Sequence, residues 1–479
     1  MVANHQHGGT RFRLFPKAYQ GYLEPETVWL SPPPGSIGPG PVDRRMHVVD
    51  ALAKEGPYDP PVWGPPYRGP IGRPALPSRD GHFDHIPLED RTFLLAHTYA
   101  STRRVLDIWE AFFGRRIEWW HVAEYPSMEL IPFVHWNNAQ SGSGFIEMGA
   151  RRNEEGVLNL FCLNFEVIAH EVGHAIAFST AGVPDPERLT ADYLAFQESF
   201  SDLIALISVS FFDSVINKLL RATHGSLYVL NLLNRIGEIS QTQQIRIADN
   251  ETRLRDLSGL RFDRFSGEWT DATGAGRNAH DLAQPLTGAI FDNLVEIFQD
   301  HLAERGVIPP GGDARGWRRE EAEAALRWFD RRWGAVFDRF EGEFRAAVIE
   351  ARDVVGRILA RIMDLIDPND LTFARVASLF LEAALDLGQQ HRIAAFRENF
   401  LERDIAAELP VRRLRVPIKR GTRLPARPRP ACFADQIEAG RRARRLAGLQ
   451  QASLQGEVRR VRPINRLLRQ THRDAGHLT

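Results

Sequence analysis

The spacing of apolar residues divides the chain into strand-like and helical stretches. Between residues 117 and 148, β-branched and aromatic residues are interrupted by Pro126 and Pro132, which predicts short strands. Elsewhere large apolar side chains recur every three or four residues, the period of one helix face. This period predicts helices at residues 91–113, 164–180, 190–212, 279–302 and 373–405, and in a long pattern that starts near residue 316.

The first 90 residues lack such a period because proline and glycine interrupt them repeatedly. Residues 31–41 read SPPPGSIGPGP, and residues 56–77 contain a further run of prolines. Proline fixes φ and lacks an amide donor, so these stretches are expected to be extended and irregular. We interpret residues 1–90 as a proline-rich extension, either a linker or a strap on the folded body. The embedded Trp63 and Ile71 favour the strap.

The carboxyl-terminal end has a different composition from the rest of the chain. Residues 411–479 contain 18 Lys and Arg against 4 Asp and Glu, with few large apolar residues. This composition predicts a disordered or loosely helical tail. The tail is either a solvated segment or a site for an anionic partner, such as nucleic acid or a membrane surface.

Composition and charge narrow the class of protein. The chain has 479 residues, 43% of them hydrophobic and 25% charged, which is typical of a large globular protein, and the net charge of −1 gives no overall attraction to nucleic acid or membranes. Cys162 and Cys432 are too few for a disulfide framework. Since the sequence contains neither a secretion signal nor an apolar run long enough to span a bilayer, we expect a cytoplasmic protein without a membrane span.

Candidate chemistry is concentrated in the predicted helix at residues 164–180. It contains His170-Glu171-Val172-Gly173-His174, an HExxH pattern. Residues four apart share a helix face, so both imidazoles can bind one ion, while Glu171 is offset and can reach a metal-bound water. The alternative is a helix that merely carries two histidines. Apolar flanks argue against it, because they would bury charged side chains that then need a partner or a metal.

A carboxylate on the next predicted helix can complete the metal site. A catalytic zinc has three protein ligands and one open position, and Glu198 is a candidate for the third ligand. Asp202, one turn further on, can accept a hydrogen bond from a ligand imidazole. The alternative is a solvated face, but Phe196 and Phe200 beside these carboxylates make simple exposure unfavourable.

These motifs resemble the thermolysin-like family of gluzincin zinc metallopeptidases over roughly residues 90–405. Besides HExxH and Glu198, the resemblance is carried by segments whose similarity is individually weaker. They are residues 96–107, Trp136-Asn-Asn-Ala139 with the glycines that follow, Leu254-Arg-Asp-Leu-Ser258, Asn278-Ala-His280 and residues 373–405.

The resemblance implies a role for each matching residue. His170, His174 and Glu198 would bind one catalytic zinc ion, and Glu171 would be the general base. Arg255 and His280 would stabilise the oxyanion, Asn138 and Ala139 would hold the substrate backbone as an added strand, and Asp202 would orient His170. The implied function is that of a zinc endopeptidase acting on a peptide or protein substrate.

The resemblance also implies a fold and a division of the chain. We expect an α+β, thermolysin-like zincin with its active-site cleft between two lobes. Residues 91–185 would form a mixed α/β lobe that includes the HExxH helix, residues 186–408 a mainly helical lobe, and residues 409–479 the basic tail.

The sequence departs from the family pattern in several places. The segment between His174 and Glu198 is longer than usual, and the assisting tyrosine of the family has no clear counterpart, with Tyr193 as a candidate. Val209 occupies a position where the family's calcium site has a carboxylate, so we do not expect bound calcium although Glu166 is present.

Two other functions are compatible with the same residues. The first is a gluzincin aminopeptidase, because Gly144-Phe-Ile-Glu-Met148 lies upstream of HExxH, although it lacks the full pattern that captures an amino terminus. The second is a non-catalytic zinc-binding scaffold in which the basic tail makes the interaction.

Overall fold

The computed structural model describes residues 8–17, 24–60, 63–227, 231–238, 244–248, 251–272, 276–308 and 322–409. These residues form both helices and sheets, as the predicted α+β class requires. The basic segment at residues 411–479 lies outside the described residues, so the anionic partner proposed for it stays a prediction.

The long helices lie where the apolar period predicts them, with two refinements. A separate helix follows the one that carries Glu198, and the last predicted helix is divided in two. The helices are α1 (Arg91–Phe113), α2 (Phe165–Thr180), α3 (Ala191–Val209), α4 (Asp213–Thr223), α5 (Ala279–Glu304), α6 (Ala322–Met363), α7 (Phe373–Asp386) and α8 (Ile393–Glu402).

Short polar side chains start the helices that matter for the site. Asn164 accepts hydrogen bonds from the amides of Glu166 and Val167 at the start of α2. Thr190 accepts from the amide of Tyr193 at the start of α3. Such side-chain acceptors satisfy amides that lack a partner within the helix, so they set where each helix begins.

The largest sheet has four strands in the order β3 (Met46–Val48), β4 (Met128–Ile131), β6 (Phe145–Met148) and β5 (Ala139–Gly142). Strands β3, β4 and β6 are parallel, whereas β5 is antiparallel to β6, with Ala139 opposite Met148. Strand β5 is therefore an edge strand, and it packs against α2.

The other strands form antiparallel pairs. They are β1 (Thr10–Leu14) with β2 (Glu26–Leu30), β7 (Ala150–Arg152) with β8 (Leu158–Leu160), β9 (Arg235–Glu238) with β10 (Gln244–Ile247), and β11 (Arg261–Asp263) with β12 (Glu268–Thr270). Short 3-10 helices lie at Phe161–Leu163, Pro186–Arg188 and Leu254–Leu257.

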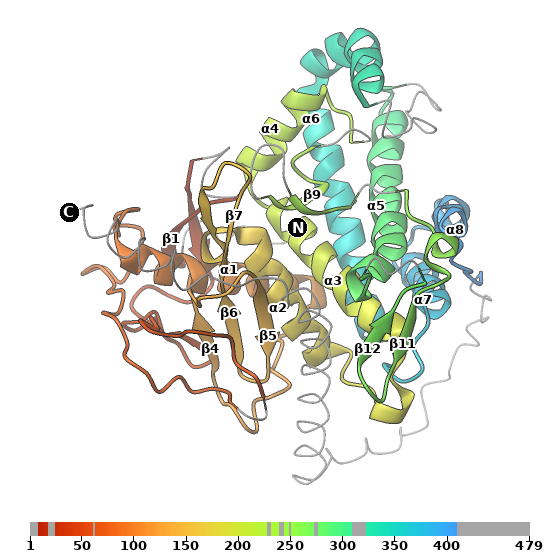
Figure 1. The fold of residues 1–479 in the computed structure, drawn as a ribbon. Helices are drawn as coiled ribbons and strands as arrows, with labels where there is room; N and C mark the ends of the chain where they lie inside the picture. Colours follow the sequence, from red (N-terminus) through yellow and green to blue (C-terminus); the bar gives the residue numbers. More distant parts are fainter. Residues whose placement is uncertain are drawn as a thin grey trace, which may run out of the picture.

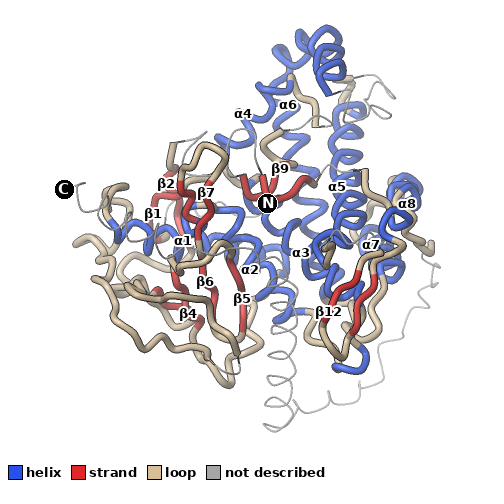
Figure 2. The backbone as a smooth tube through the Cα atoms, in the orientation of Figure 1, coloured by secondary structure: helices blue, strands red, loops and turns tan. Residues whose placement is uncertain are grey.

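Figure 1 shows how these elements are arranged. The four-stranded sheet, β1 and α1 lie on one side, and α4 to α8 lie on the other, with α2 and α3 between them. Figure 2 shows that most strands and long loops lie on the side of the four-stranded sheet, whereas the other side is mostly helical and includes the strands β9 and β12. One continuous hydrophobic core runs through both sides, from Phe12 near the amino terminus to Ala407.

The described residues before position 90 contribute side chains to this core, so they are not the separate linker that was one of the two interpretations of this segment. Phe12 and Leu14 on β1 are fully buried, and Phe12 stacks on Phe83 with ring centroids 4.7 Å apart. Strand β3 completes the four-stranded sheet. The sequence pattern missed these strands because runs of three to five residues between prolines are too short to show a clear period.

The proline-rich stretch around residue 60 is clamped on the sheet by a buried lysine, in agreement with the strap alternative. Lys54 Nζ lies 3.0 Å from Glu147 Oε2 on β6. The same ammonium lies 3.6 Å from the ring centroid of Tyr58 and 3.8 Å from that of Trp63. The aromatic faces and the carboxylate together offset the cost of burying the charge.

His97 on α1 joins the amino-terminal strand region to the body, and its protonation should destabilise the protein. Its Nδ1–H donates to the carbonyl of Cys162 at 2.8 Å, and its Nε2 accepts the amide N–H of Phe15 at 3.1 Å. A proton on Nε2 would face another donor. Complete burial, which opposes the charged form, lowers the pKa of His97 from 6.5 to about 4.

The stability contribution of neutral His97 should therefore be complete above pH 6.5 and be lost as the pH falls towards 4. We expect about 3 kcal/mol of the free energy of unfolding to disappear over this interval. Urea unfolding of wild type and His97→Gln at several pH values checks it. The variant should show a shallower dependence on pH, and an identical dependence in both proteins would contradict the prediction.

None of the described helices has by itself the length and apolar composition to span a membrane. Helices α3 and α4, which meet at a bend of 92°, reach that length and composition only when they are taken together.

Candidate metal centre

Helix α2 places two imidazoles and a carboxylate in one buried position. His170 and His174 are 5% and 8% exposed, and Glu171 is 7% exposed. The helix is apolar around them, so it is buried from Phe165 to Phe178. The four-residue spacing puts both imidazoles on one face, as the HExxH pattern predicts.

Helix α3 brings Glu198 to the histidines because α2 and α3 pack very closely. A Cβ atom built on Gly173 would lie 2.7 Å from the Cα atom of Ser201. Only glycine allows this approach, since a real side chain would have to push the two backbones apart. Gly173 thus has a packing role: it lets α2 approach α3 closely enough to bring Glu198 to the two histidines.

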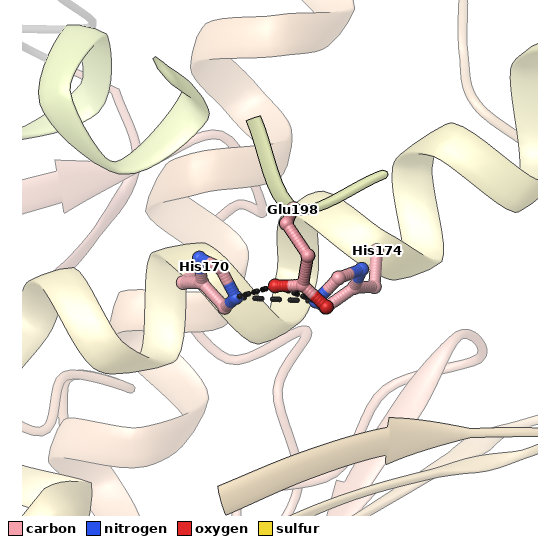
Figure 3. Close-up of side chains that lie close together, drawn as sticks. All are labelled: His170, His174 and Glu198. Atoms are coloured by element: carbon pink, nitrogen blue, oxygen red, sulfur yellow. Dashed lines mark hydrogen bonds and ion pairs between the residues drawn. The ribbon is translucent and has the colours of Figure 1, made fainter. Parts of the chain in front are cut away.

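The three candidate ligands converge from the two helices (Figure 3). The Nε2 atoms of His170 and His174 are 3.1 Å apart. Glu198 Oε2 lies 3.3 Å from the Nε2 of His170 and 3.6 Å from that of His174. Among the described residues, this is the group of histidine, cysteine and acidic side chains that could hold a metal ion.

The geometry of this cluster fits a small divalent ion such as zinc. Ligand atoms about 2.0–2.1 Å from a tetrahedral zinc ion lie about 3.3 Å from one another. The observed separations of 3.1, 3.3 and 3.6 Å are close to that value. Because His170 Nδ1 donates to Asp202, loss of the proton on Nε2 would leave a lone pair directed at His174, and an ion between the two rings would satisfy both nitrogens.

Asp202, for which the sequence predicts a contact with a ligand imidazole, lies beside His170. Its Oδ1 accepts from His170 Nδ1 at 2.8 Å, and its side chain is 1% exposed. One helical turn separates it from Glu198, so α3 presents a ligand and the partner of a ligand on the same face. This contact selects the ring orientation in which Nε2 of His170 faces the other two ligands.

The arginine at the cluster is Arg246 on β10, and this corrects the placement expected for Arg255. Arg246 Nε donates to Asp202 Oδ1 at 2.8 Å, and its Nη2 lies 3.0 Å from His170 Nδ1. Since Nδ1 gives its proton to Asp202, the second contact packs the guanidinium against the ring. Arg255 instead binds Asp404 at 2.7 Å on the surface, with 63% of its side chain exposed.

The sequence contains only a weak signal for Arg246. Residues 244–247 read QIRI, in which Arg246 alternates with two isoleucines as on a half-buried strand. The segment around Arg255 is a short 3-10 helix whose first turn binds Asp404. Its resemblance in sequence therefore does not bring the Arg255 side chain to the candidate metal ligands.

His280 lies at the cluster, as predicted. It is the second residue of α5, whose first turn is closed by a reciprocal pair of hydrogen bonds between Asn278 and Asp281. Its Nδ1 is 2.8 Å from Glu198 Oε2 and 3.0 Å from Arg246 Nη1. With a quarter of its side chain exposed, His280 is accessible from solvent.

Burial and contacts between the side chains of the cluster shift the pKa values of these groups. Burial lowers the pKa of His174 to about 4, so its imidazole is neutral. Burial opposes a charged Glu198, yet His280 and a hydrogen bond from His170 hold the pKa of this carboxyl well below its usual range. A neutral imidazole and an ionised carboxylate are the forms in which these side chains bind zinc.

The other two side chains of the cluster, Glu171 and His170, have raised pKa values. Burial raises the pKa of Glu171 to about 7. Burial and Arg246 lower the pKa of His170, but hydrogen bonds with Asp202 and Glu198 outweigh them and raise it to about 9. Such divergent values in one buried cluster are typical of functional sites.

The residues predicted to hold substrate lie at the beginning of the edge strand. Ala139 is the first residue of β5 and is buried, whereas Asn138 is half-buried and precedes the strand. The carbonyl of Asn138 accepts the amide of Gly149 at 2.8 Å, which fixes this corner of the sheet. Strand β5 is the edge strand of the four-stranded sheet, and it packs against α2.

Tyr193 does not take the place of the family's assisting tyrosine. It is fully buried, its hydroxyl donates to the carbonyl of Gly182 at 2.8 Å, and it accepts from Gln197 Nε2 at 2.8 Å. These contacts hold the turn after α2 against the start of α3.

Replacing Gly173 by alanine should destabilise the protein and weaken zinc binding together. Alanine improves helix propensity by about 1 kcal/mol, but the new methyl group overlaps backbone of α3, and overpacking of this kind costs about 1–3 kcal/mol. Urea unfolding without metal and competition with a zinc chelator measure the two effects.

Gly342 on α6 provides the matched control, because a Cβ atom there meets nothing within 4 Å. Gly342→Ala should therefore be neutral or stabilising and leave zinc affinity unchanged. If Gly173→Ala behaved in the same way, the close packing of α2 on α3 would not be what assembles the cluster.

Comparison with known proteins does not establish the function of this chain. No protein-family model matches the chain, and no curated protein matches it. Among solved structures, it is similar to the precursor of protealysin, a metalloproteinase from Serratia proteamaculans. The sequence identity is 12%, the TM-score is 0.33, and the match covers 64% of this chain and 86% of that chain. A likeness of this size is too small to assign an activity.

Proposed function

We propose that this chain is a zinc metalloendopeptidase of the thermolysin-like, gluzincin kind, which cleaves peptide bonds in a cleft between a mixed α/β lobe and a helical lobe. One observation carries the proposal. Two imidazole nitrogens from α2 and a carboxylate oxygen from α3 lie 3.1 to 3.6 Å apart, and the turn of α2 that carries the imidazoles also carries the buried Glu171. Three ligands beside a general base are the arrangement of a hydrolytic zinc site.

The chemistry follows from the placement of each group. Zinc held by His170, His174 and Glu198 would act as a Lewis acid and lower the pKa of a water molecule towards neutrality. Glu171 accepts a proton from the attacking water and later delivers one to the leaving amine. Asp202 keeps His170 in the orientation in which it binds metal.

Arg246 and His280 complete the proposed machinery. Both lie at the edge of the cluster, and both are donors when protonated. We assign them the stabilisation of the oxygen that becomes negative when water adds to the peptide carbonyl. The substrate would lie along the free edge of β5 next to Asn138 and Ala139, as an added strand.

Metal analysis combined with peptide digestion tests the proposal. Purified protein should contain one zinc ion per chain and should cleave internal bonds in peptides with blocked termini. A chelator should abolish cleavage, and added zinc should restore it. Stoichiometric zinc without cleavage of any member of a broad peptide library would refute the endopeptidase activity and favour the non-catalytic scaffold.

The blocked amino terminus in this assay also separates an endopeptidase from an aminopeptidase. The carboxylate in the segment that suggests an aminopeptidase is Glu147, and it is already engaged. It is fully buried, pairs with Lys54 at 3.0 Å and accepts the amide of Tyr58 at 2.6 Å. A carboxylate held in this way is not placed to capture an amino terminus, which favours the endopeptidase.

A further inference from the structure

The strand that carries Arg246 belongs to a sheet of two strands, which needs support from elsewhere. Strands β9 and β10 pair so that Arg246 lies opposite Ile236 and Ile247 opposite Arg235. An isolated two-stranded hairpin is marginally stable in water. The position of Arg246 therefore depends on what fixes β9 to the rest of the molecule.

Strand β9 is attached to the start of the HExxH helix. Asn164 Nδ2 donates to the carbonyl of Glu238 at 2.9 Å, and the amide of Gly237 donates to Glu166 Oε2 at 3.2 Å. Glu166 is fully buried and lies one turn before His170 on α2. Its other oxygen, Oε1, faces the amino-terminal segment of the chain.

Lys17 joins these elements. Its side chain is fully buried, and its Nζ lies 2.7 Å from Glu166 Oε1. The same ammonium donates to the backbone carbonyl of Arg235 at 3.0 Å. Lys17 lies three residues after the end of β1. Phe15, two residues before Lys17, donates its amide to His97 of α1. One ammonium thus links the amino-terminal segment, helix α2 and strand β9.

We propose that Lys17 is a positioning residue for the active site: its buried ammonium fixes β9 on α2 and thereby sets the position of Arg246. The inference rests on the proposed function in so far as Arg246 acts on a substrate. Lys17 touches none of the candidate metal ligands, and its effect passes through Arg235 and the strand pairing. The contact that carries this effect joins Lys17 and Arg235, which are 218 positions apart in the chain.

Charge explains why a lysine is needed at this place. Glu166 and Glu238 are both fully buried, and Glu238 pairs with Arg235 at 3.0 Å. Burial raises the pKa of Glu166 to about 7, with the carboxylate of Glu238 adding to the effect and Lys17 opposing it. Without the ammonium, two buried carboxylates would face each other between α2 and β9, and β9 would move away.

Hydrogen exchange of Lys17→Met tests the proposal without relying on activity. Methionine keeps most of the side-chain volume but removes the charge and the donors. We expect amides at residues 235–238 and 244–248 to exchange roughly tenfold faster or more, while amides of α5 and α7 keep their protection. Zinc-loaded protein should show the lower kcat that a displaced Arg246 causes, with little change in KM, because small misplacements of a catalytic group can cost about 10²-fold.

Lys54→Met is the matched control, because Lys54 is an equally buried lysine paired with a glutamate in another part of the fold. It should leave exchange at β9 and β10 unchanged. The double variant Lys17→Met/Glu166→Gln removes the unpaired charge and so protects the test against failure to fold. It should still show fast exchange of β9 and β10.

The outcomes separate the two proposals. Unchanged exchange of β9 and β10 in Lys17→Met would overturn the positioning role, as would a uniform loss of protection along the whole chain in both variants. A wild-type protein without any turnover would instead overturn the peptidase function and leave the exchange result to decide the role of Lys17.

Discussion

Replacing Glu171 by glutamine should lower kcat/KM for peptide hydrolysis by about 10²–10⁴-fold while one zinc ion per chain stays bound. Glutamine has nearly the same size and shape but cannot accept a proton from water. Glu171 is offset by one residue from His170 on α2 and is not one of the three side chains that form the candidate metal group. The loss should therefore be chemical, without loss of the metal.

Glu198→Gln is the informative comparison for this variant. Glu198 Oε2 lies within 3.6 Å of both ligand nitrogens, so this change should weaken zinc binding and activity together. Zinc content by metal analysis and kcat/KM on a blocked peptide distinguish the two outcomes. Wild-type activity of Glu171→Gln would show that another group removes the proton, and loss of its zinc would show that Glu171 belongs to the metal site.

Arg246→Ala should lower kcat/KM by about 10²–10³-fold, the effect of removing one donor that stabilises a developing oxyanion. Its guanidinium contacts Asp202, His170 and His280 within 3.0 Å, so it is the cation nearest to the cluster among the arginines that the structure describes there. Most of the effect should appear in kcat, because the interaction becomes strong only when charge develops on the substrate.

Arg255→Ala provides the control from the same chain. Arg255 binds Asp404 on the surface and touches none of the candidate ligands. An exposed ion pair contributes about 0–1 kcal/mol, so its loss should leave both stability and hydrolysis near wild type. Arg246→Lys should be intermediate, since lysine keeps the charge but not the planar fork of donors. A stronger defect in Arg255→Ala than in Arg246→Ala would restore the assignment made from the sequence.

The local chemistry of the site was predictable because it depends on short spacings along helices. The four-residue interval between His170 and His174 places both rings on one face whatever surrounds the helix. The same interval between Glu198 and Asp202 places a candidate ligand and the hydrogen-bond partner of His170 together on α3. The lengths of α1, α2 and α5 follow equally from the apolar period and from capping residues such as Asn164.

What the sequence by itself determined is therefore the HExxH helix, the candidate third ligand Glu198 and the α+β class, because these depend on interactions between residues close in the chain. Only the tertiary structure decided that Arg246 rather than Arg255 reaches the cluster, and that residues before 90 belong to the core. Both facts depend on contacts across long sequence separations, such as Lys17 with Arg235 and β3 with β4. Short strands without a clear period carry no local signal of the partner against which they will pack.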